Sequence, residues 1–77
     1  MKNSDVVYAW ANNRIANTQN LRTDGSNLYS YALKIGYTDG HKKVAIDHTS
    51  GGGSFYSSTT SRHVSLAKQK SDVVEKP

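Results

Sequence analysis

Apolar and polar side chains alternate without a break through the middle of the chain and predict a β-strand over residues 29–38. The large side chains occupy the odd positions: Tyr29, Tyr31, Leu33, Ile35 and Tyr37. Asp-Gly pairs at 24–25 and 39–40 flank this strand. Asp-Gly between alternating segments is a strong hairpin signal, because both central residues of a type I′ turn need positive φ. The pattern therefore predicts antiparallel neighbours on both sides.

The hydrophobic pattern also predicts a register for each hairpin. If residues 39–40 form a two-residue loop, Ile35 faces Val44 and Leu33 faces Ile46, which keeps both pairs on one apolar face. The turn at 24–25 places Leu21 opposite Leu28, and because Leu28 falls on the face opposite Leu33 and Ile35, a bulge or an edge contact is expected there. A glycine-rich loop at 49–53 follows, and residues 54–56 resume a short strand.

A helix is predicted from Ser4 to about Asn17. Ser4 is a suitable N-cap residue, and Val7, Ala11 and Ile15 recur at helical spacing to form one buried stripe. A second helix is predicted from about Thr60 to Val74, with the hydroxyl groups at 59–61 as candidate caps.

These elements predict one small α+β domain over residues 1–77. It consists of an N-terminal helix, a three- to four-stranded antiparallel sheet (a β-meander) and a C-terminal helix, with both helices on one sheet face. Residues 1–3 and 75–77 are expected to fray. A chain of this length buries a small core, and it has no cysteine to form a disulfide, so oligomerisation or a partner surface stays open.

Charge and hydropathy narrow the class of protein. Ten Lys and Arg against six Asp and Glu give a net charge of +4, which suits a polyanionic partner and also suits simple solubility. The longest apolar run is far shorter than the roughly 20 residues that a membrane span needs, and the first residues lack the pattern of a secretory signal. The sequence predicts a cytoplasmic protein that makes no membrane contact.

Candidate contact residues lie at two places. The hydroxyl run at 56–61 leads into Arg62 and His63, where a capped helix start next to a cation favours an anion. Capping alone also explains the hydroxyl groups. Three lysines near the second hairpin, Lys34, Lys42 and Lys43, complete the predicted contact set.

Catalysis and metal binding find little support. Ser61 and His63 are two residues apart on a helix start and do not face each other. The three histidines, His41, His48 and His63, have no cysteine partners and no helical i, i+4 spacing. We therefore expect a non-enzymatic protein with no metal and no cofactor.

Three segments together resemble a family of small proteins encoded by bacteriophages and prophages. They are WANNR at 10–14, LYSYALKIG at 28–36 and FYSSTTSRHVSLAK at 55–68. Many members carry a glycine after Tyr-Ser-Tyr, where this chain has Ala32. The resemblance implies a viral context more than a mechanism.

Small phage proteins of this kind often act on host machinery, including as inhibitors of CRISPR and other defence systems. By that analogy, the expected function is engagement of a host protein or ribonucleoprotein complex that handles nucleic acid, in the form of an anti-CRISPR-like inhibitor. The alternative is direct DNA or RNA binding through a basic surface.

Overall fold

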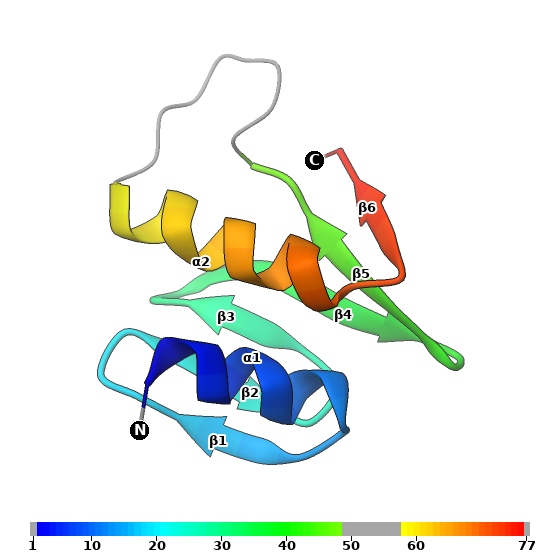
Figure 1. The fold of residues 1–77 in the computed structure, drawn as a ribbon, viewed down its shortest axis with the longest axis horizontal. Helices are drawn as coiled ribbons and strands as arrows, with labels where there is room; N and C mark the ends of the chain where they lie inside the picture. Colours follow the sequence, from blue (N-terminus) through cyan, green and yellow to red (C-terminus); the bar gives the residue numbers. More distant parts are fainter. Residues whose placement is uncertain (1, 49–57, 77) are drawn as a thin grey trace.

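Residues 2–48 and 58–76 are described by a computed structural model, which contains two helices and a six-stranded sheet (Figure 1). The elements are α1 (Asn3–Ala11), β1 (Ile15–Asn17), β2 (Leu21–Asp24), β3 (Leu28–Ser30), β4 (Leu33–Asp39), β5 (Lys42–Ile46), α2 (Ser58–Lys70) and β6 (Val73–Glu75). The predicted loop at 49–53 and strand at 54–56 lie outside the described residues.

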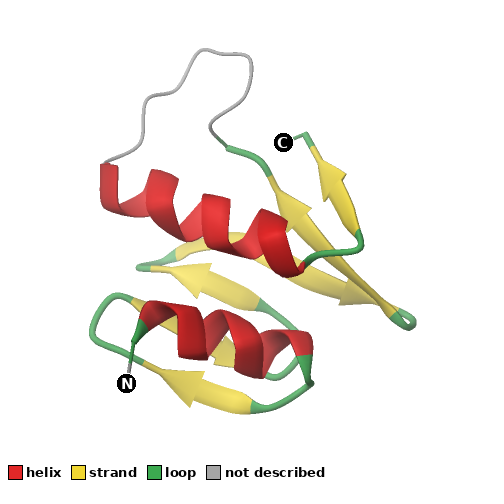
Figure 2. Ribbon diagram, in the orientation of Figure 1, coloured by secondary structure: helices red, strands yellow, loops and turns green. Residues whose placement is uncertain are grey.

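The α+β class with a helix near each end is confirmed (Figure 2). The predicted sheet of three or four antiparallel strands is wrong in number and in direction at one edge. Six strands lie in chain order from β1 to β6, and the last pair, β5 and β6, is parallel.

Both helices cover the same face of the sheet, as predicted. α1 packs on β1 and β2, α2 packs on β4 and β5, and the helices contact each other (Figure 1). The core between the layers contains Val6, Val7, Trp10, Ala16, Leu21, Leu28, Ile35, Ala45, Val64 and Ala67. We call the covered side of the sheet the inner face and the opposite side the outer face.

α1 ends at Ala11, six residues before the predicted Asn17. Asn13 adopts a left-handed conformation with φ of 60°. Two backbone hydrogen bonds end the helix there: the Asn13 N–H donates to the Trp10 carbonyl, and the Arg14 N–H donates to the Ala9 carbonyl. This is the hydrogen-bond pattern with which helices commonly terminate, and asparagine tolerates the conformation it needs. Ile15 therefore lies on β1 with 81% of its surface exposed, not in a buried helical stripe.

The predicted strand over 29–38 is two strands joined by a tight turn. Ser30 pairs with Leu33, so Tyr31 and Ala32 form the loop, and Tyr31 has a φ of 56°. A two-residue turn places its flanking residues on the same face of the sheet. The single apolar face predicted for the odd positions is therefore divided.

A β-bulge at Ile35 changes the alternation once more. Leu28 pairs with Gly36 and Tyr29 with Lys34, which leaves Ile35 as the extra residue. Ile35 and Gly36 are both buried, whereas Tyr37, the next residue, is only half-buried. Turn and bulge together place Tyr29, Lys34 and Tyr37 on the outer face.

Both Asp-Gly pairs do mark hairpins, but the register differs from the prediction. Leu21 pairs with Ser30 rather than Leu28, and Val44 pairs with Tyr37 rather than Ile35. In each hairpin the glycine is the first loop residue with positive φ, so the aspartate belongs to the strand. The loop therefore begins one residue later than predicted, which moves each partner two positions along the second strand.

The second helix also differs at both ends. It begins at Ser58, so the candidate caps at 59–61 lie in its first turn, and it ends at Lys70 rather than Val74. Residues 73–75 form β6 instead. Two hydrogen bonds between Lys43 and Asp72 hold the start of β6 in place. The Lys43 N–H donates to the Asp72 carboxylate over 2.8 Å, and the Asp72 N–H donates to the Lys43 carbonyl over 2.7 Å.

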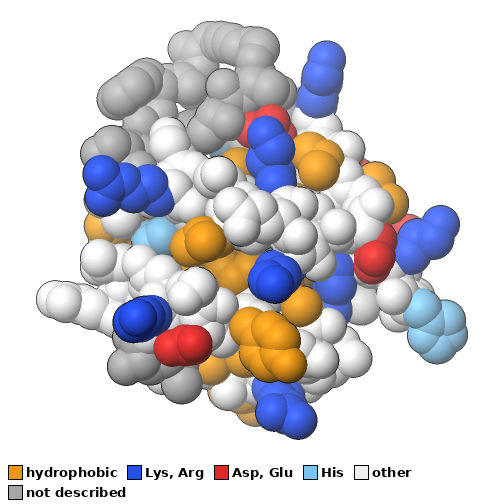
Figure 3. Space-filling model, in the orientation of Figure 1, with side chains coloured by type: hydrophobic (Ala, Val, Ile, Leu, Met, Phe, Trp, Pro, Cys, Tyr) orange, Lys and Arg blue, Asp and Glu red, His pale blue; other side chains and the backbone are white. Residues whose placement is uncertain are grey.

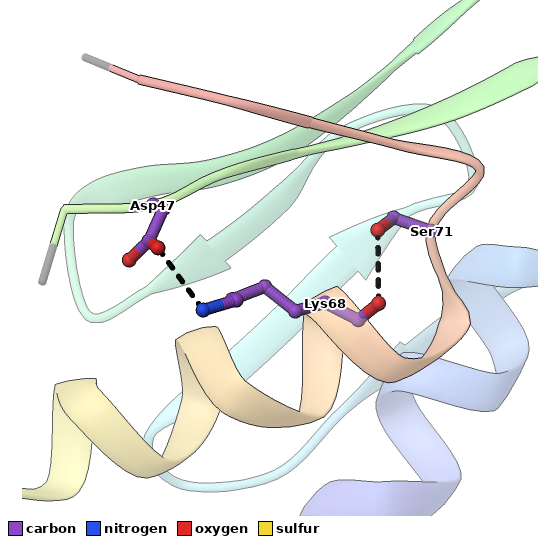
Figure 4. A network of polar contacts seen from close by, with 3 residues as sticks. All are labelled: Asp47, Lys68 and Ser71. Atoms are coloured by element: carbon purple, nitrogen blue, oxygen red, sulfur yellow. Dashed lines mark hydrogen bonds and ion pairs between the residues drawn. The ribbon is translucent and has the colours of Figure 1, made fainter. Parts of the chain in front are cut away.

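An ion pair fastens α2 to the end of β5. The Lys68 ammonium lies 3.0 Å from the Asp47 carboxylate, and the Ser71 hydroxyl donates to the Lys68 carbonyl where the helix ends (Figure 4). The Asp47 side chain is buried and the Lys68 side chain is exposed, so this pair is partly shielded from screening by salt.

Gly36 allows α1 to approach the sheet, which generates the first prediction. A methyl group added there would lie 2.8 Å from Cζ2 of Trp10 and 3.3 Å from Cβ of Leu28. Gly36→Ala should lower the free energy of unfolding by about 1–3 kcal/mol through overpacking. Urea unfolding followed by tryptophan fluorescence measures this change. Gly40→Asn, in open space at a φ of 62° that asparagine tolerates, is the control and should change stability by less than about 0.5 kcal/mol.

Candidate functional site

His63 lies between α2 and the sheet with 1% of its surface exposed. Its Nδ1 is 2.7 Å from Oγ of Ser30 on β3, and its Nε2 is 3.0 Å from Nδ2 of Asn3 on α1. His63, a predicted contact residue, is therefore buried between the two layers. Its inward position follows from the helical stripe, because Val64 and Ala67 beside it are also buried.

The partners of His63 determine where its proton lies. Thr18 Oγ1 accepts N–H groups from Asn20 and Leu21 and donates to Oδ1 of Asn3 at 2.8 Å, a shorter contact than the one it makes with the Leu21 carbonyl at 3.3 Å. The Asn3 NH2 group then faces His63 and donates to Nε2. With Asn3 as the donor to Nε2, a neutral His63 ring carries its proton on Nδ1 and donates it to Ser30.

This proton arrangement determines what the serine–histidine pair can do. A histidine that activates a serine must accept the serine proton, but Nδ1 of His63 already carries one. The Ser30 hydroxyl instead donates onward to Thr60 Oγ1 at 3.4 Å. Ser30 and Thr60 are also buried. The network from Asn3 to Thr60 joins both helices to β3 and is suited to structure rather than to nucleophilic catalysis.

Burial lowers the pKa of His63 below its usual value of 6.5. An unfolded chain therefore takes up a proton on this ring at a higher pH than the folded chain does. Stability from the neutral ring is fully present above about pH 6.5 and is lost as the pH falls through the interval between the two pKa values.

The second prediction is a loss of stability on mild acidification that depends on His63. The free energy of unfolding should fall between pH 7 and pH 5, and His63→Gln should flatten this dependence. His41→Gln, at an exposed position in the β4–β5 turn, should keep the dependence of the original protein. NMR titration of the His63 ring in the unsubstituted protein measures the same pKa. A ring that titrates at or above pH 6.5 would contradict the argument.

Lys43, another predicted contact residue, is also buried. Its ammonium donates to Asn13 Oδ1 at 2.7 Å, to Thr38 Oγ1 at 2.6 Å and to the Gly25 carbonyl at 3.2 Å. It also lies 5.5 Å from the centre of the Trp10 ring, within the range of a cation–π interaction. Burial lowers the pKa of Lys43, and the nearby Asp72 carboxylate opposes this shift.

The third prediction compares two adjacent lysines. Lys43→Met should lower the free energy of unfolding by about 2–4 kcal/mol, because three oxygen acceptors lose a buried cation. Lys42→Met, at the exposed neighbouring position, should change it by less than about 0.5 kcal/mol. Chemical denaturation of both variants measures the difference. Equal effects would show that the Lys43 ammonium contributes nothing beyond an exposed charge.

The three remaining predicted contacts are exposed but lie apart. Arg62 is on α2, Lys34 is near the start of β4, and Lys42 is at the start of β5 beside Asp39. Asp39 is five positions after Lys34 along the strand, which corresponds to roughly 15 Å. On the helical side, Lys and Arg side chains are scattered and form no single patch (Figure 3).

Lys34 instead belongs to a set of four residues that lie side by side on the outer face, one each on β1, β2, β3 and β4. Asn17 pairs with Arg22, Arg22 with Tyr29, and Tyr29 with Lys34, so these four residues form one row. The Arg22 guanidinium lies 4.9 Å from the centre of the Tyr29 ring. We call Asn17, Arg22, Tyr29 and Lys34 the cation–aromatic row. Sequence reasoning missed it because Tyr29 was assigned to the apolar face.

A groove of about 440 Å³ lies beside this row. It is lined by Ile15, Ala16, Asn17, Arg22, Thr23, Asp24 and Tyr29. Asp24 is held by its own turn, where its carboxylate accepts the N–H groups of Ser26 and Asn27. These hydrogen bonds, the one from Asn27 first, lower the pKa of Asp24, so the groove has one charged acidic end.

The described residues offer no cluster of three or more His, Asp or Glu side chains that could hold a metal ion. Within residues 2–48 and 58–76, no helix is long and apolar enough to cross a membrane. Comparisons with protein-family models, curated proteins and solved structures found no match to this chain. Among the described residues, the cation–aromatic row combines the half-buried ring of Tyr29 with the exposed cations Arg22 and Lys34.

Proposed function

We propose that this protein is a non-enzymatic binding protein that engages a nucleic-acid-handling complex of a host cell, with the cation–aromatic row as its contact surface. The observation that carries the proposal is the alignment of Arg22, Tyr29 and Lys34 on adjacent strands of the outer face. Arginine and tyrosine are the residue types that dominate binding energy at protein interfaces.

The row is suited to binding because its backbone is held rigidly. Arg22, Tyr29 and Lys34 lie within paired strands, and both helices are packed against the other face of the sheet. A rigid surface loses little conformational entropy when a partner binds. The excess of positive charge, +4 over the whole chain, favours a partner whose surface is anionic.

Counter-defence is the form of this function that the resemblance to phage proteins favours. An inhibitor of a CRISPR-type complex needs a complementary surface and no catalytic group. A neutral, buried His63 whose Nδ1 proton faces Ser30 is consistent with a protein that acts by binding.

The fourth prediction uses two variants of equal charge. Arg22→Ala/Lys34→Ala removes two cations from the row, and Arg62→Ala/Lys70→Ala removes two exposed cations from α2. Tagged protein should retain a nucleic-acid-handling complex from bacterial host lysate, identified by mass spectrometry. The row variant should retain at least tenfold less, whereas the α2 variant should retain a similar amount.

Circular dichroism shows whether both variants remain folded, and nuclease treatment of the lysate shows whether nucleic acid bridges the interaction. Retention that is specific and lost only in the row variant supports the proposal, and its response to nuclease shows whether the row contacts protein or nucleic acid within the complex. Retention lost in the α2 variant instead would place the contact at Arg62, as the sequence predicted. No specific retention in any sample would overturn the proposed function.

A further inference from the structure

The geometry points to single-stranded nucleic acid as the chemical group that the cation–aromatic row contacts. This inference rests on the proposed function and names the part of the complex that would be bound directly. It commits to the nucleic acid rather than to a protein surface, because the side chains of the row match the two requirements of single-strand binding. Those requirements are an aromatic platform for bases and cations for the phosphate backbone.

Tyr29 and Arg22 provide the platform. The guanidinium lies 4.9 Å from the ring centre, and bases stack on both tyrosine rings and arginine planes. Tyr29 is half-buried, so its ring is supported by neighbours and still reaches solvent. A base stacked on this pair would extend an arrangement that already exists without the ligand.

Lys34 and Arg22 provide the charges on either side of the ring. Each sits on a strand next to β3, and adjacent strands lie about 4.8 Å apart, so the two backbone positions are about 10 Å apart. A single nucleic-acid strand that crosses the sheet from β4 towards β1 would meet Lys34, Tyr29 and Arg22 in turn. Asn17 follows on β1, with an amide that both donates and accepts hydrogen bonds.

The groove beside the row gives room for a base and limits where phosphates can lie. Ile15 adds an apolar wall with 81% of its surface exposed, and Asp24 adds a negative charge at the same end. Asp24 pairs with Ile15, two positions along the strands from the cross-strand pair of Arg22 and Asn17 and therefore on the same face. Phosphates would therefore follow the Lys34 and Arg22 side, and a base would enter the groove.

Duplex DNA fits this face less well. A duplex is read by an element that enters its groove, most often a helix, whereas α1 and α2 both lie on the inner face. Bases stacked within a duplex also cannot reach a tyrosine on a sheet. Single-stranded RNA and DNA share the chemistry that the row recognises, and the test separates them.

Fluorescence anisotropy with labelled oligothymidine, oligouridine and a matched duplex tests the inference at low salt. Both single strands should bind more tightly than the duplex. Tyr29→Ala should weaken binding by about 5- to 100-fold, the range expected for losing one stacked base, and Tyr29→Phe should restore most of it. Tyr8→Ala, which removes a tyrosine exposed on α1, is the matched control and should bind as the original protein does.

Salt dependence tests the phosphate contacts separately. Two phosphate contacts predict a slope of about −1.4 in a plot of log K against log salt concentration, and Lys34→Ala should reduce its magnitude by about 0.7. Arg62→Ala/Lys70→Ala should leave the slope unchanged. Stronger binding to the duplex, or loss of binding in the α2 variant instead of the row variants, would overturn the inference.

The two proposals fail in different ways. If no oligonucleotide binds but the row variant still loses a nuclease-resistant host complex, the single-strand inference is wrong and the proposed function stands. If oligonucleotides bind as expected but no host complex is retained, the row binds nucleic acid without the proposed partner. If neither experiment shows binding, both proposals are wrong.

Discussion

The buried ammonium of Lys43 is the interaction on which the arrangement of the sheet depends. A buried cation is tolerated only when its hydrogen bonds are satisfied, and here the acceptors come from three separate segments. Asn13 lies just after α1, Gly25 in the β2–β3 turn, and Thr38 on β4. The Lys43 ammonium therefore joins the segment after α1, the β2–β3 turn and β4 to β5, close to the ring of Trp10.

Local signals in the sequence predicted the elements of the fold better than their pairing. The α+β class and the hairpins at the two Asp-Gly pairs followed from periodicity and turn chemistry. The turn at Tyr31 could not be predicted this way. Tyr31 adopts a left-handed conformation, but tyrosine is not one of the residue types that indicate a turn. It is held by tertiary contacts: the Tyr31 N–H donates to the Asn20 carbonyl, and Ser30 beside it reaches His63.

The candidate site was predicted in part, for the same reason. Lys34 was named from its charge, but its companions on the outer face, Arg22 and Tyr29, depend on the register and on the bulge at Ile35. His63 was named from its place at the capped helix start and Lys43 from its charge, and burial assigns both to structural networks. A polar residue in a sequence indicates a side chain that can form hydrogen bonds or carry charge. Whether that side chain contacts a partner or stabilises the fold depends on long-range pairing.

The same bulge links the core to the proposed surface. By inserting Ile35, the chain places Ile35 and Gly36 together on the inner face, where the absence of a side chain at Gly36 admits the Trp10 ring. Without the extra residue, one of these two positions would face outwards, and Lys34 would lose its place opposite Tyr29. Close packing of α1 and alignment of the row thus have one structural cause. A change that removes the bulge should therefore affect stability and binding together, whereas truncation of the exposed Lys34 side chain should affect binding alone.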